Sequence, residues 1–270
     1  MKSRLSAILL VLSAVIMSLP LCAQNRNSQS SEHKDVVKAV RSKVKVLAEY
    51  PHDRGAYTQG LFIKDGVMYE SSGQYGKSYF AIVNKENGKW VRKWKFMNKY
   101  FLEGACMFGD NIYILTWQEH TCFVYSLNNP EKKFKKIGTA SYSTEGWGIT
   151  ASDSELIMSD GSSTLMFLDP GSFYCTRRIQ VTLNGRAVNY LNELEYIDGK
   201  IWANVYYSDN ILIINPQTGV VERVIDCSGL LPDSLRRADT DVLNGIAYDA
   251  ADGSVYITGK LWPKMYKIAK

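Results

Sequence analysis

Apolar and polar residues follow one another through this chain in short runs, and one arrangement of them recurs five times. Each copy consists of an apolar run, a turn made of Asp, Gly, Asn or Ser, and a second run with alternating apolar positions. This arrangement predicts a β-hairpin. The five copies read TQGLFIKDGVMYES, LEGACMFGDNIYIL, GWGITASDSELIMS, LNELEYIDGKIWAN and LNGIAYDAADGSVYIT.

The spacing of these hairpins predicts how they assemble. The first four are each followed by a third apolar run, and a turn then leads to a fourth strand. The copies can be aligned on one column of residues: Gly60, Gly104, Gly148, Glu193 and Gly245. Their spacings are 44, 44, 45 and 52 residues, and a polar insert between Pro232 and Asp241 lengthens the last. Four strands in about 40–45 residues make one blade of a β-propeller.

The two ends of the repeat region complement each other. The fifth copy has only three strands before Lys270, and the segment Val44–Pro51 before the first copy can supply a fourth. This pairing would close the ring and cover an open sheet edge. We therefore predict an all-β fold, a five-bladed β-propeller over residues 44–270 with an N-terminal strand closing the last blade. Because a closed ring leaves no edge for a partner, we expect a monomer.

The first 23 residues have the pattern of a secretory signal peptide. Lys2 and Arg4 precede a short apolar run that ends in the small residues Cys22 and Ala23. The run is too short for a stable membrane span, so we expect export to the periplasm or out of the cell. A lipoprotein anchored at Cys22 is disfavoured, because bulky Leu21 stands where lipoprotein signals carry a small residue.

Cleavage after Ala23 would leave Gln24 at the mature N-terminus. Residues 24–43 are polar, rich in Asn, Ser and Gln, and poor in aromatic residues. Such a composition offers little apolar surface to bury, which predicts a flexible arm.

Charge and cysteine content limit the function classes. The formal net charge is +5, and removal of Lys2 and Arg4 leaves +3 for the mature chain. This charge is small and scattered, which argues against nucleic-acid binding. An exported chain permits disulfides, but the four cysteines of the mature chain are widely spaced and the sequence does not show which of them would pair. Cys106 and Cys122 fall in apolar strand patterns, where buried thiols are expected.

One column of residues predicts a binding site. The inner strand of each propeller blade lines the central channel, so the residues just before the aligned column converge there. They are Gln59, Glu103, Trp147, Asn192 and Asn244. Polar groups in a semi-enclosed space must pair with each other or serve a ligand. We favour a ligand site over a network that only binds water.

Several strings resemble, in order, the plant and bacterial β-propeller type of glutaminyl-peptide cyclotransferase. They are HDRGAYTQGL, FLEGA, LTW, GWGIT, SDGSSTLMFLDP, LNELEYIDGKIWANV, VLNGIAYD and TGKLWP, and the resemblance covers residues 50–270. It implies an acyltransferase that converts the N-terminal glutamine of peptides and proteins into pyroglutamate and releases ammonia. Gln24 of the mature chain would then itself be a potential substrate.

The resemblance also implies roles for individual residues. FLEGA matches the family string that carries the acid/base glutamate, which makes Glu103 the catalytic candidate. The alternative is a structural glutamate paired with Lys260. Tyr57 and Tyr206 stand where the family usually carries Phe and Trp. The implied substrate-binding residues are Tyr57, Gln59, Phe101, Trp117, Trp147, Asn192, Tyr206 and Lys260.

No cofactor is expected from the sequence. His33, His52 and His120 are not spaced as metal ligands, so the predicted reaction is metal-independent. Asn244 and channel carbonyls could hold a structural calcium ion. The competing hypothesis is a non-catalytic secreted propeller that binds peptide or glycan at the channel mouth. A calcium-dependent propeller hydrolase is disfavoured, because the column supplies a single carboxylate.

Overall fold

The tight turns of the inner hairpins show why the strands form where they do. Asp65 and Gly66 have φ angles of 52° and 75°, and Asp198 and Gly199 have φ angles of 48° and 76°. Two consecutive positive φ angles define the turn whose twist matches that of paired strands. Each Asp-Gly pair therefore sets the register of its hairpin, and the apolar runs on either side become the strands.

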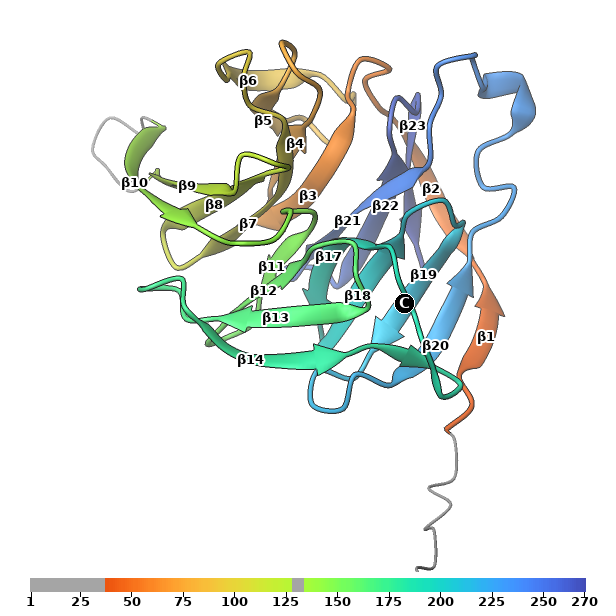
Figure 1. The fold of residues 1–270 in the computed structure, drawn as a ribbon. Coiled ribbons are helices and arrows are strands. Elements are labelled where there is room, and N and C mark those ends of the chain that lie inside the picture. The colour runs from red at the N-terminus through yellow and green to blue at the C-terminus, as the bar shows by residue number, and fades with distance from the viewer. Residues whose placement is uncertain (1–36, 128–133) are drawn as a thin grey trace, which may run out of the picture. The chain divides into compact units, whose positions relative to one another are not determined.

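The computed structural model describes residues 37–127 and 134–270. These residues form five blades around a central axis (Figure 1). Blade 1 contains β3 (Thr58–Lys64), β4 (Val67–Ser72), β5 (Tyr79–Val83) and β6 (Trp90–Lys95). Blade 2 contains β7 (Leu102–Phe108), β8 (Asn111–Thr116), β9 (Thr121–Ser126) and β10 (Lys135–Ser141). Blade 3 contains β11 (Ile149–Ala151), β12 (Leu156–Ser159), β13 (Thr164–Leu168) and β14 (Cys175–Gln180).

The last two blades follow a small hairpin of β15 (Thr182–Leu183) and β16 (Arg186–Ala187). Blade 4 contains β17 (Leu191–Ile197), β18 (Lys200–Val205), β19 (Asn210–Ile214) and β20 (Val221–Asp226). Blade 5 contains β21 (Leu243–Asp249), β22 (Ser254–Gly259), β23 (Lys264–Ile268) and β2 (Val46–Pro51). A short 3-10 helix, η1 (Asp233–Leu235), lies in the connection between these two blades.

The inner strands of the blades form a closed ring. Strand β3 contacts β7, β7 contacts β11, β11 contacts β17, β17 contacts β21, and β21 contacts β3 again. Strand β2 pairs antiparallel with β23, from Val46 opposite Ile268 to Pro51 opposite Lys264, and is the outermost strand of blade 5. The structure therefore has the five-bladed propeller architecture that the repeats predict.

The end of the predicted polar arm has a defined structure. Strand β1 (Val40–Lys43) pairs in parallel with β20 at the outer edge of blade 4, and Lys43 Nζ donates to Ser228 O at 2.6 Å. The expectation of a flexible arm over residues 24–43 is therefore wrong for these four residues. Pairing of this kind uses the backbone of an exposed edge and needs no apolar pattern, because the side chains of β1 stay largely exposed.

The other expectations for the N-terminus concern residues outside the described part of the chain. These are the signal peptide over residues 1–23, the lipoprotein alternative at Cys22, the new terminus at Gln24 and the rest of the arm to residue 36. In the part that the structure describes, no helix is long and apolar enough to span a membrane.

The hydrophobic core lies between neighbouring blades. Trp202 and Trp262 are buried in one cluster that joins blades 4 and 5, and Phe134 stacks on Tyr125 with ring centroids 3.8 Å apart in blade 2. The cysteines of the described residues are free thiols, and Cys106 and Cys122 are buried as the sequence predicts. Burial raises the pKa of both of these thiols, so they behave as small core residues.

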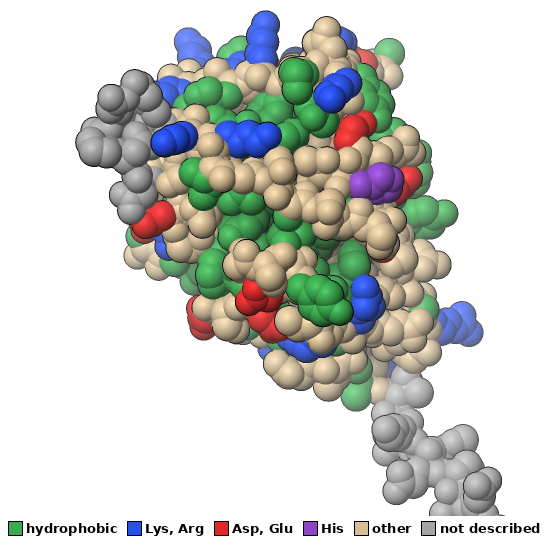
Figure 2. Space-filling model, turned by 60° about the vertical axis from the view of Figure 1, so that its left-hand side comes forward, with side chains coloured by type: hydrophobic (Ala, Val, Ile, Leu, Met, Phe, Trp, Pro, Cys, Tyr) green, Lys and Arg blue, Asp and Glu red, His purple; other side chains and the backbone are tan. Residues whose placement is uncertain are grey.

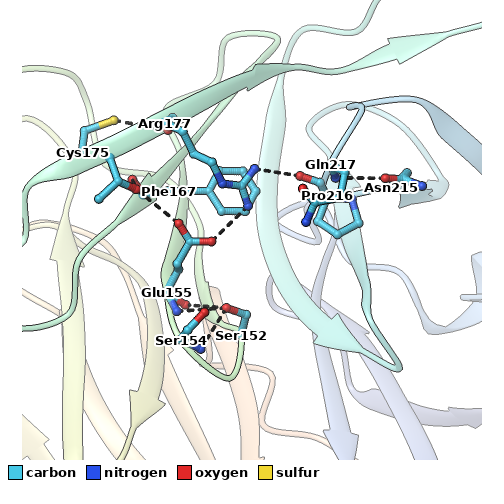
Figure 3. A network of polar contacts seen from close by, with 10 residues as sticks. Ser152, Ser154, Glu155, Phe167, Cys175, Arg177, Asn215, Pro216 and Gln217 are labelled. Atoms are coloured by element: carbon cyan, nitrogen blue, oxygen red, sulfur yellow. Dashed lines mark hydrogen bonds and ion pairs between the residues drawn. The ribbon is translucent and has the colours of Figure 1, made fainter.

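Polar contacts also connect neighbouring blades. Arg177 of β14 forms an ion pair with Glu155 at 3.0 Å and donates to Pro216 O of blade 4 at 2.9 Å (Figure 3). Its guanidinium carbon lies 3.3 Å from the centre of the Phe167 ring. One side chain thus ties the outer strands of blade 3 to the connection between β19 and β20.

Charged side chains of both signs lie on the face of the molecule that Figure 2 shows. On the face in Figure 2, basic and acidic side chains lie scattered among polar and apolar ones, with no continuous field of either sign. Nucleic-acid binding requires a basic patch or stripe, and the expectation that this protein binds no nucleic acid stays a prediction from its sequence.

Candidate active site

The residues of the predicted column lie at irregularities of the inner strands. The register shifts between Thr58 and Gly60 in β3, and β7, β17 and β21 shift at the equivalent place. The extra residues of such β-bulges leave the regular ladder and change the direction of the side chains. Four of the five column residues, all except Trp147, therefore lie at β-bulges, outside the regular pairing of their strands.

The glycines of the aligned column let neighbouring inner strands touch. A Cβ atom on Gly148 would lie 2.0 Å from Asn192 O, and one on Gly104 would lie 2.7 Å from Ile149 N. Glu193, which replaces Gly in the fourth copy, reaches across the ring. Its carboxylate accepts hydrogen bonds from Leu61 N at 3.2 Å and Ile246 N at 2.9 Å. These contacts make a floor across the channel, because neighbouring backbones touch around the ring and the Glu193 side chain spans it.

Hydrogen bonds between blades hold the column in place. Ser71 Oγ donates to Glu103 O at 2.5 Å, and Ser159 Oγ donates to Asn192 O at 2.7 Å. Gly104 N donates to Trp147 O at 2.7 Å. Each of these bonds joins one blade to the next, so the positions of the column residues depend on the assembled ring.

A pocket of about 250 Å³ lies above this floor. It brings together every residue that the sequence predicted to bind or transform the substrate. The lining residues are Tyr57, Gln59, Phe101, Glu103, Trp117, Trp147, Asn192, Tyr206 and Lys260. Asn244, the fifth member of the column, does not line the pocket and lies behind Gln59.

Glu103 is the one carboxylate among the lining residues. Its side chain is buried, and Oε1 accepts a hydrogen bond from Gln59 Nε2 at 3.1 Å. Burial raises the pKa of Glu103 well above its usual range; the positive charge of Lys260 opposes this shift, and Glu145 and Glu119 add to it. A carboxyl group with such a pKa can exchange a proton near neutral pH.

A chain of amide hydrogen bonds orients Gln59. Asn244 Nδ2 donates to Thr58 O at 2.9 Å and to Gln59 Oε1 at 3.3 Å. Because the Gln59 oxygen accepts from Asn244, its nitrogen faces Glu103. Gln59 therefore occupies one oxygen of Glu103 and leaves the other available to a substrate.

Lys260 faces the pocket from blade 5. Its ammonium lies 4.9 Å from the centre of the Tyr57 ring and 4.7 Å from that of Tyr206. Burial lowers the pKa of Lys260, against the attraction of Glu103 and Asp241. Within the described residues, Lys260 makes no ion pair with Glu103 at 4 Å or less. The alternative that Glu103 is a structural partner of Lys260 therefore lacks the direct contact it requires.

Asp241, from the polar insert, fixes Tyr57. Tyr57 Oη donates to Asp241 Oδ2 at 2.6 Å. Burial raises the pKa of Tyr57, and the hydrogen bond to Asp241 adds to this effect, so the phenol stays protonated. The Tyr57 ring meets Phe101 edge to face at 6.3 Å. Tyrosine here keeps the aromatic surface of phenylalanine, and its hydroxyl joins the insert to the pocket.

Glu145 holds both pocket tryptophans and was not singled out by the sequence. Its Oε2 accepts hydrogen bonds from Trp117 Nε1 at 2.8 Å and Trp147 Nε1 at 2.9 Å. Although burial opposes it, the hydrogen bonds from Trp147, Trp117 and Gln118 lower the pKa of Glu145, which keeps it ionised. In the sequence, the one feature that points to Glu145 is its position two residues before Trp147.

The remaining lining residues complete an aromatic wall with one free polar atom. Trp147 meets Tyr206 edge to face at 5.7 Å, and Phe101 meets Trp117 at 5.5 Å. Asn192 is buried, and its Oδ1 has no hydrogen-bond partner within the described residues. A buried acceptor without a partner is costly, so this atom is suited to a donor on a bound ligand.

The histidines of the described residues lie away from the pocket. His52 bonds to Glu70 Oε1 at 3.0 Å and to Trp262 O at 2.9 Å, and His120 bonds to Thr144 O at 2.7 Å. The residues that the structure describes contain no group of three or more His, Cys, Asp or Glu that could hold a metal ion. Asn244 Oδ1 is buried without a partner, but a single amide oxygen is a poor match for the six to eight oxygen ligands of calcium.

Fold and pocket together define a five-bladed β-propeller enzyme with one buried carboxyl group in an aromatic pocket on its axis. The sequence model of the family described as glutamine cyclotransferase matches residues 14–269. The chain belongs to this family.

Two relatives show the same relationship. The chain is 40% identical over 232 residues to the glutaminyl-peptide cyclotransferase of Arabidopsis thaliana, which covers 84% of this chain and 71% of that protein. The crystal structure of Myxococcus xanthus glutaminyl cyclase superposes with a TM-score of 0.78 and 34% identity, covering 86% of this chain and 98% of that one.

Proposed function

We propose that this protein cyclises the N-terminal glutamine of peptides and proteins to pyroglutamate, with Glu103 as the single general acid and base. The family and both relatives support glutaminyl cyclisation. The observation that carries the role of Glu103 is its position: a buried carboxyl group with raised pKa, one oxygen held by Gln59 and the other facing an aromatic pocket.

The pocket supports a folded pose of the glutamine. Trp117 and Trp147 would enclose the aliphatic part of the side chain, and their rings would lie against the neutral α-amino group. Asn192 Oδ1 would accept a hydrogen bond from the side-chain amide, which satisfies an otherwise unpaired atom. Holding the amine against the amide carbon supplies the orientation that ring closure requires.

One residue, Glu103, can both accept and return the proton that the reaction moves. The neutral α-amine attacks the γ-carbonyl carbon, and the new C–N bond closes the five-membered ring. Glu103, as the carboxylate, accepts the proton that the attacking nitrogen gives up. Glu103 then donates this proton to the departing amide nitrogen, the old C–N bond breaks, and ammonia leaves. Lys260 Nζ would donate to the carbonyl oxygen while negative charge develops on it.

The chemistry of the lining residues supports catalysis by proton transfer without a metal. The pocket offers one carboxyl group and neither His nor Cys, and zinc in catalytic sites is held by three such ligands. We therefore assign every step to side chains of the protein. A structural calcium ion near Asn244 stays a prediction from the sequence, and no step depends on it.

The protein's location and its own N-terminus form part of the proposal. The pattern of residues 1–23 supports export, with the periplasm or the medium as the place of action, and a closed ring supports a monomer. Gln24 of the mature chain would then meet the same activity. Mass spectrometry of the mature protein tests this point, and an unmodified Gln24 or a different first residue would contradict it.

The decisive assay measures ammonia and product together. The purified protein is incubated with peptides that begin with Gln, with and without a chelator, and with matched peptides that begin with Asn. We expect one ammonia per Gln peptide, unaffected by chelator, and none from the Asn peptides. Absence of product from every Gln peptide would favour a non-catalytic peptide-binding propeller instead.

A further inference from the structure

A second hollow adjoins the active-site pocket. It has a volume of about 310 Å³ and is lined by Tyr207, Ser208, Asp209, Arg236, Thr240, Asp241, Val242 and Leu243. Most of these residues come from two segments: the loop after β18, and the polar insert that makes the last repeat spacing the longest. We call this hollow the insert groove.

The insert groove and the pocket share a wall. Tyr207 in the groove lies against Tyr206 of the pocket with ring centroids 3.9 Å apart. Asp241 in the groove accepts the hydrogen bond from Tyr57 of the pocket, and Asp241 N donates to Lys260 O at 3.1 Å. A bound peptide that extends out of the pocket would therefore enter the insert groove once its backbone passes Tyr206 and Tyr207.

The insert is fastened to the rest of the protein. Arg54 Nη1 donates to Leu235 O at 3.0 Å, which ties η1 to the loop between β2 and β3. Trp262 Nε1 donates to Asp241 O at 2.9 Å, and Arg237 N donates to Thr240 Oγ1 at 2.8 Å. A wall held in this way exists before a ligand arrives, which lowers the entropic cost of binding.

The groove presents two groups with free binding capacity. Tyr207 is 75% exposed, and its backbone φ of 62° lies in the left-handed region that non-glycine residues rarely occupy. Arg236 approaches Asp233 at 3.7 Å through Nε, and its guanidinium carbon lies 6.0 Å from the centre of the Trp262 ring; within the described residues no hydrogen bond engages its terminal amines. An open aromatic face and unpaired guanidinium donors suit an extended peptide, with a side chain on the ring and a carbonyl oxygen on the guanidinium.

We propose that the insert groove is the subsite for the residues that follow the N-terminal glutamine, so that the enzyme is built for peptides and proteins rather than for glutamine amide. This inference rests on the proposed function. The floor of the channel blocks the far side of the pocket, and a volume of about 250 Å³ is small for a binding pocket. The rest of a bound peptide must therefore leave through the mouth and lie against a surface outside it.

The test compares substrates of different length in matched variants. The ratio of kcat/KM for a Gln tetrapeptide to that for glutamine amide is measured in the parent, in Tyr207→Ala and in Arg236→Ala. Two control variants remove equivalent side chains elsewhere. Tyr174 is also 75% exposed but lies in the turn between β13 and β14, and Arg237 pairs with Asp239 outside the groove.

We expect the parent to favour the tetrapeptide and each groove variant to lower the ratio about tenfold, as the loss of a strong contact in an interface does. The control variants should keep the parental ratio. A parent that does not distinguish the two substrates, or groove variants with the same ratio as the controls, would overturn the inference.

A binding measurement separates this inference from the proposed reaction. In a Glu103→Gln background, the Kd of the tetrapeptide is measured by titration calorimetry with and without Tyr207→Ala. We expect about tenfold weaker binding with the second substitution, and equal Kd values would overturn the subsite. If the parent turned over no glutamine substrate, the proposed reaction would fail, and these Kd values alone would decide the role of the groove.

Discussion

Gln59 Nε2 and Glu103 Oε1 form a hydrogen bond of 3.1 Å between the inner strands of blades 1 and 2. This bond leaves one carboxyl oxygen for chemistry and fixes its direction. Gln59 is oriented in turn by Asn244 of blade 5. The catalytic candidate is therefore positioned by three blades, although only one of them contains it.

Glu103→Gln should abolish the proton relay while keeping the shape of the pocket. General acid–base catalysis contributes about 10²–10⁴-fold, so we expect kcat to fall by at least that range with little change in substrate affinity. Initial rates of ammonia release measure the loss. Near-parental turnover would remove Glu103 from the mechanism.

The same substitution should stabilise the fold at high pH. The folded-state pKa of Glu103 is raised, so the folded protein loses stability as pH rises from the unfolded pKa through the folded one. The Gln side chain does not titrate, so the Glu103→Gln variant does not lose this stability as pH rises. Its Tm should exceed that of the parent most clearly at pH 8 and least at pH 4. Thermal melts across pH measure the difference, and a constant or reversed difference would contradict the buried-charge account.

Removing the charge of Lys260 and removing that of Glu145 should move the acid limb of the pH–rate profile in opposite directions. The positive charge of Lys260 lowers the pKa of Glu103, and the negative charge of Glu145 raises it. In Lys260→Met, the acid limb of kcat/KM should move to higher pH, and in Glu145→Gln it should move to lower pH. Profiles that shift in the same direction, or not at all, would show that Glu103 does not control this limb.

Glu145 should act on binding through the two indoles. In Glu145→Ala, both indole N–H groups lose their acceptor, so we expect KM to rise about tenfold, the effect of about 1.4 kcal/mol. Glu145→Gln retains an oxygen that can accept both bonds, so its KM should stay near the parental value. Equal effects of the two substitutions on KM would exclude this positioning role.

Arg177→Ala should destabilise the propeller without affecting catalysis. The variant loses an ion pair, a hydrogen bond to blade 4 and a contact with the Phe167 ring. We expect about 1–3 kcal/mol less stability, read by urea denaturation. The neighbouring Arg178→Ala is the control, since its exposed side chain lacks these contacts, and it should change stability by about 0.5 kcal/mol or less.

The sequence predicts the fold because its determinants are local. Asp-Gly turns, alternating apolar runs and the spacing of the repeats are each visible within a few dozen residues. The column of Gln59, Glu103, Trp147 and Asn192 is visible because the repeat places one residue of each inner strand at the same level. All nine pocket residues could thus be named from the repeat and from the resemblance to the family.

The residues that escaped prediction act mainly through contacts with segments distant in the sequence. Glu145 binds Trp117 and Trp147 from blades 2 and 3, and Asp241 reaches Tyr57 across 184 residues of sequence. Strand β1 pairs through its backbone, which leaves no pattern in its side chains. None of these contacts has a periodicity or a motif, and apart from the local pair of Glu145 and Trp147 their partners meet only in the folded protein.

The pairing of β2 with β23 links the timing of activity to synthesis. Strand β2 can pair with β23 only after Ile268, more than two hundred residues after Val46, has been synthesised. Until then blade 5 lacks its outer strand. Lys260 precedes β23 by only a few residues, so it too is made late. A ribosome-bound or truncated chain therefore contains Glu103 without the surroundings that tune it. Such a chain should be inert until blade 5 is complete.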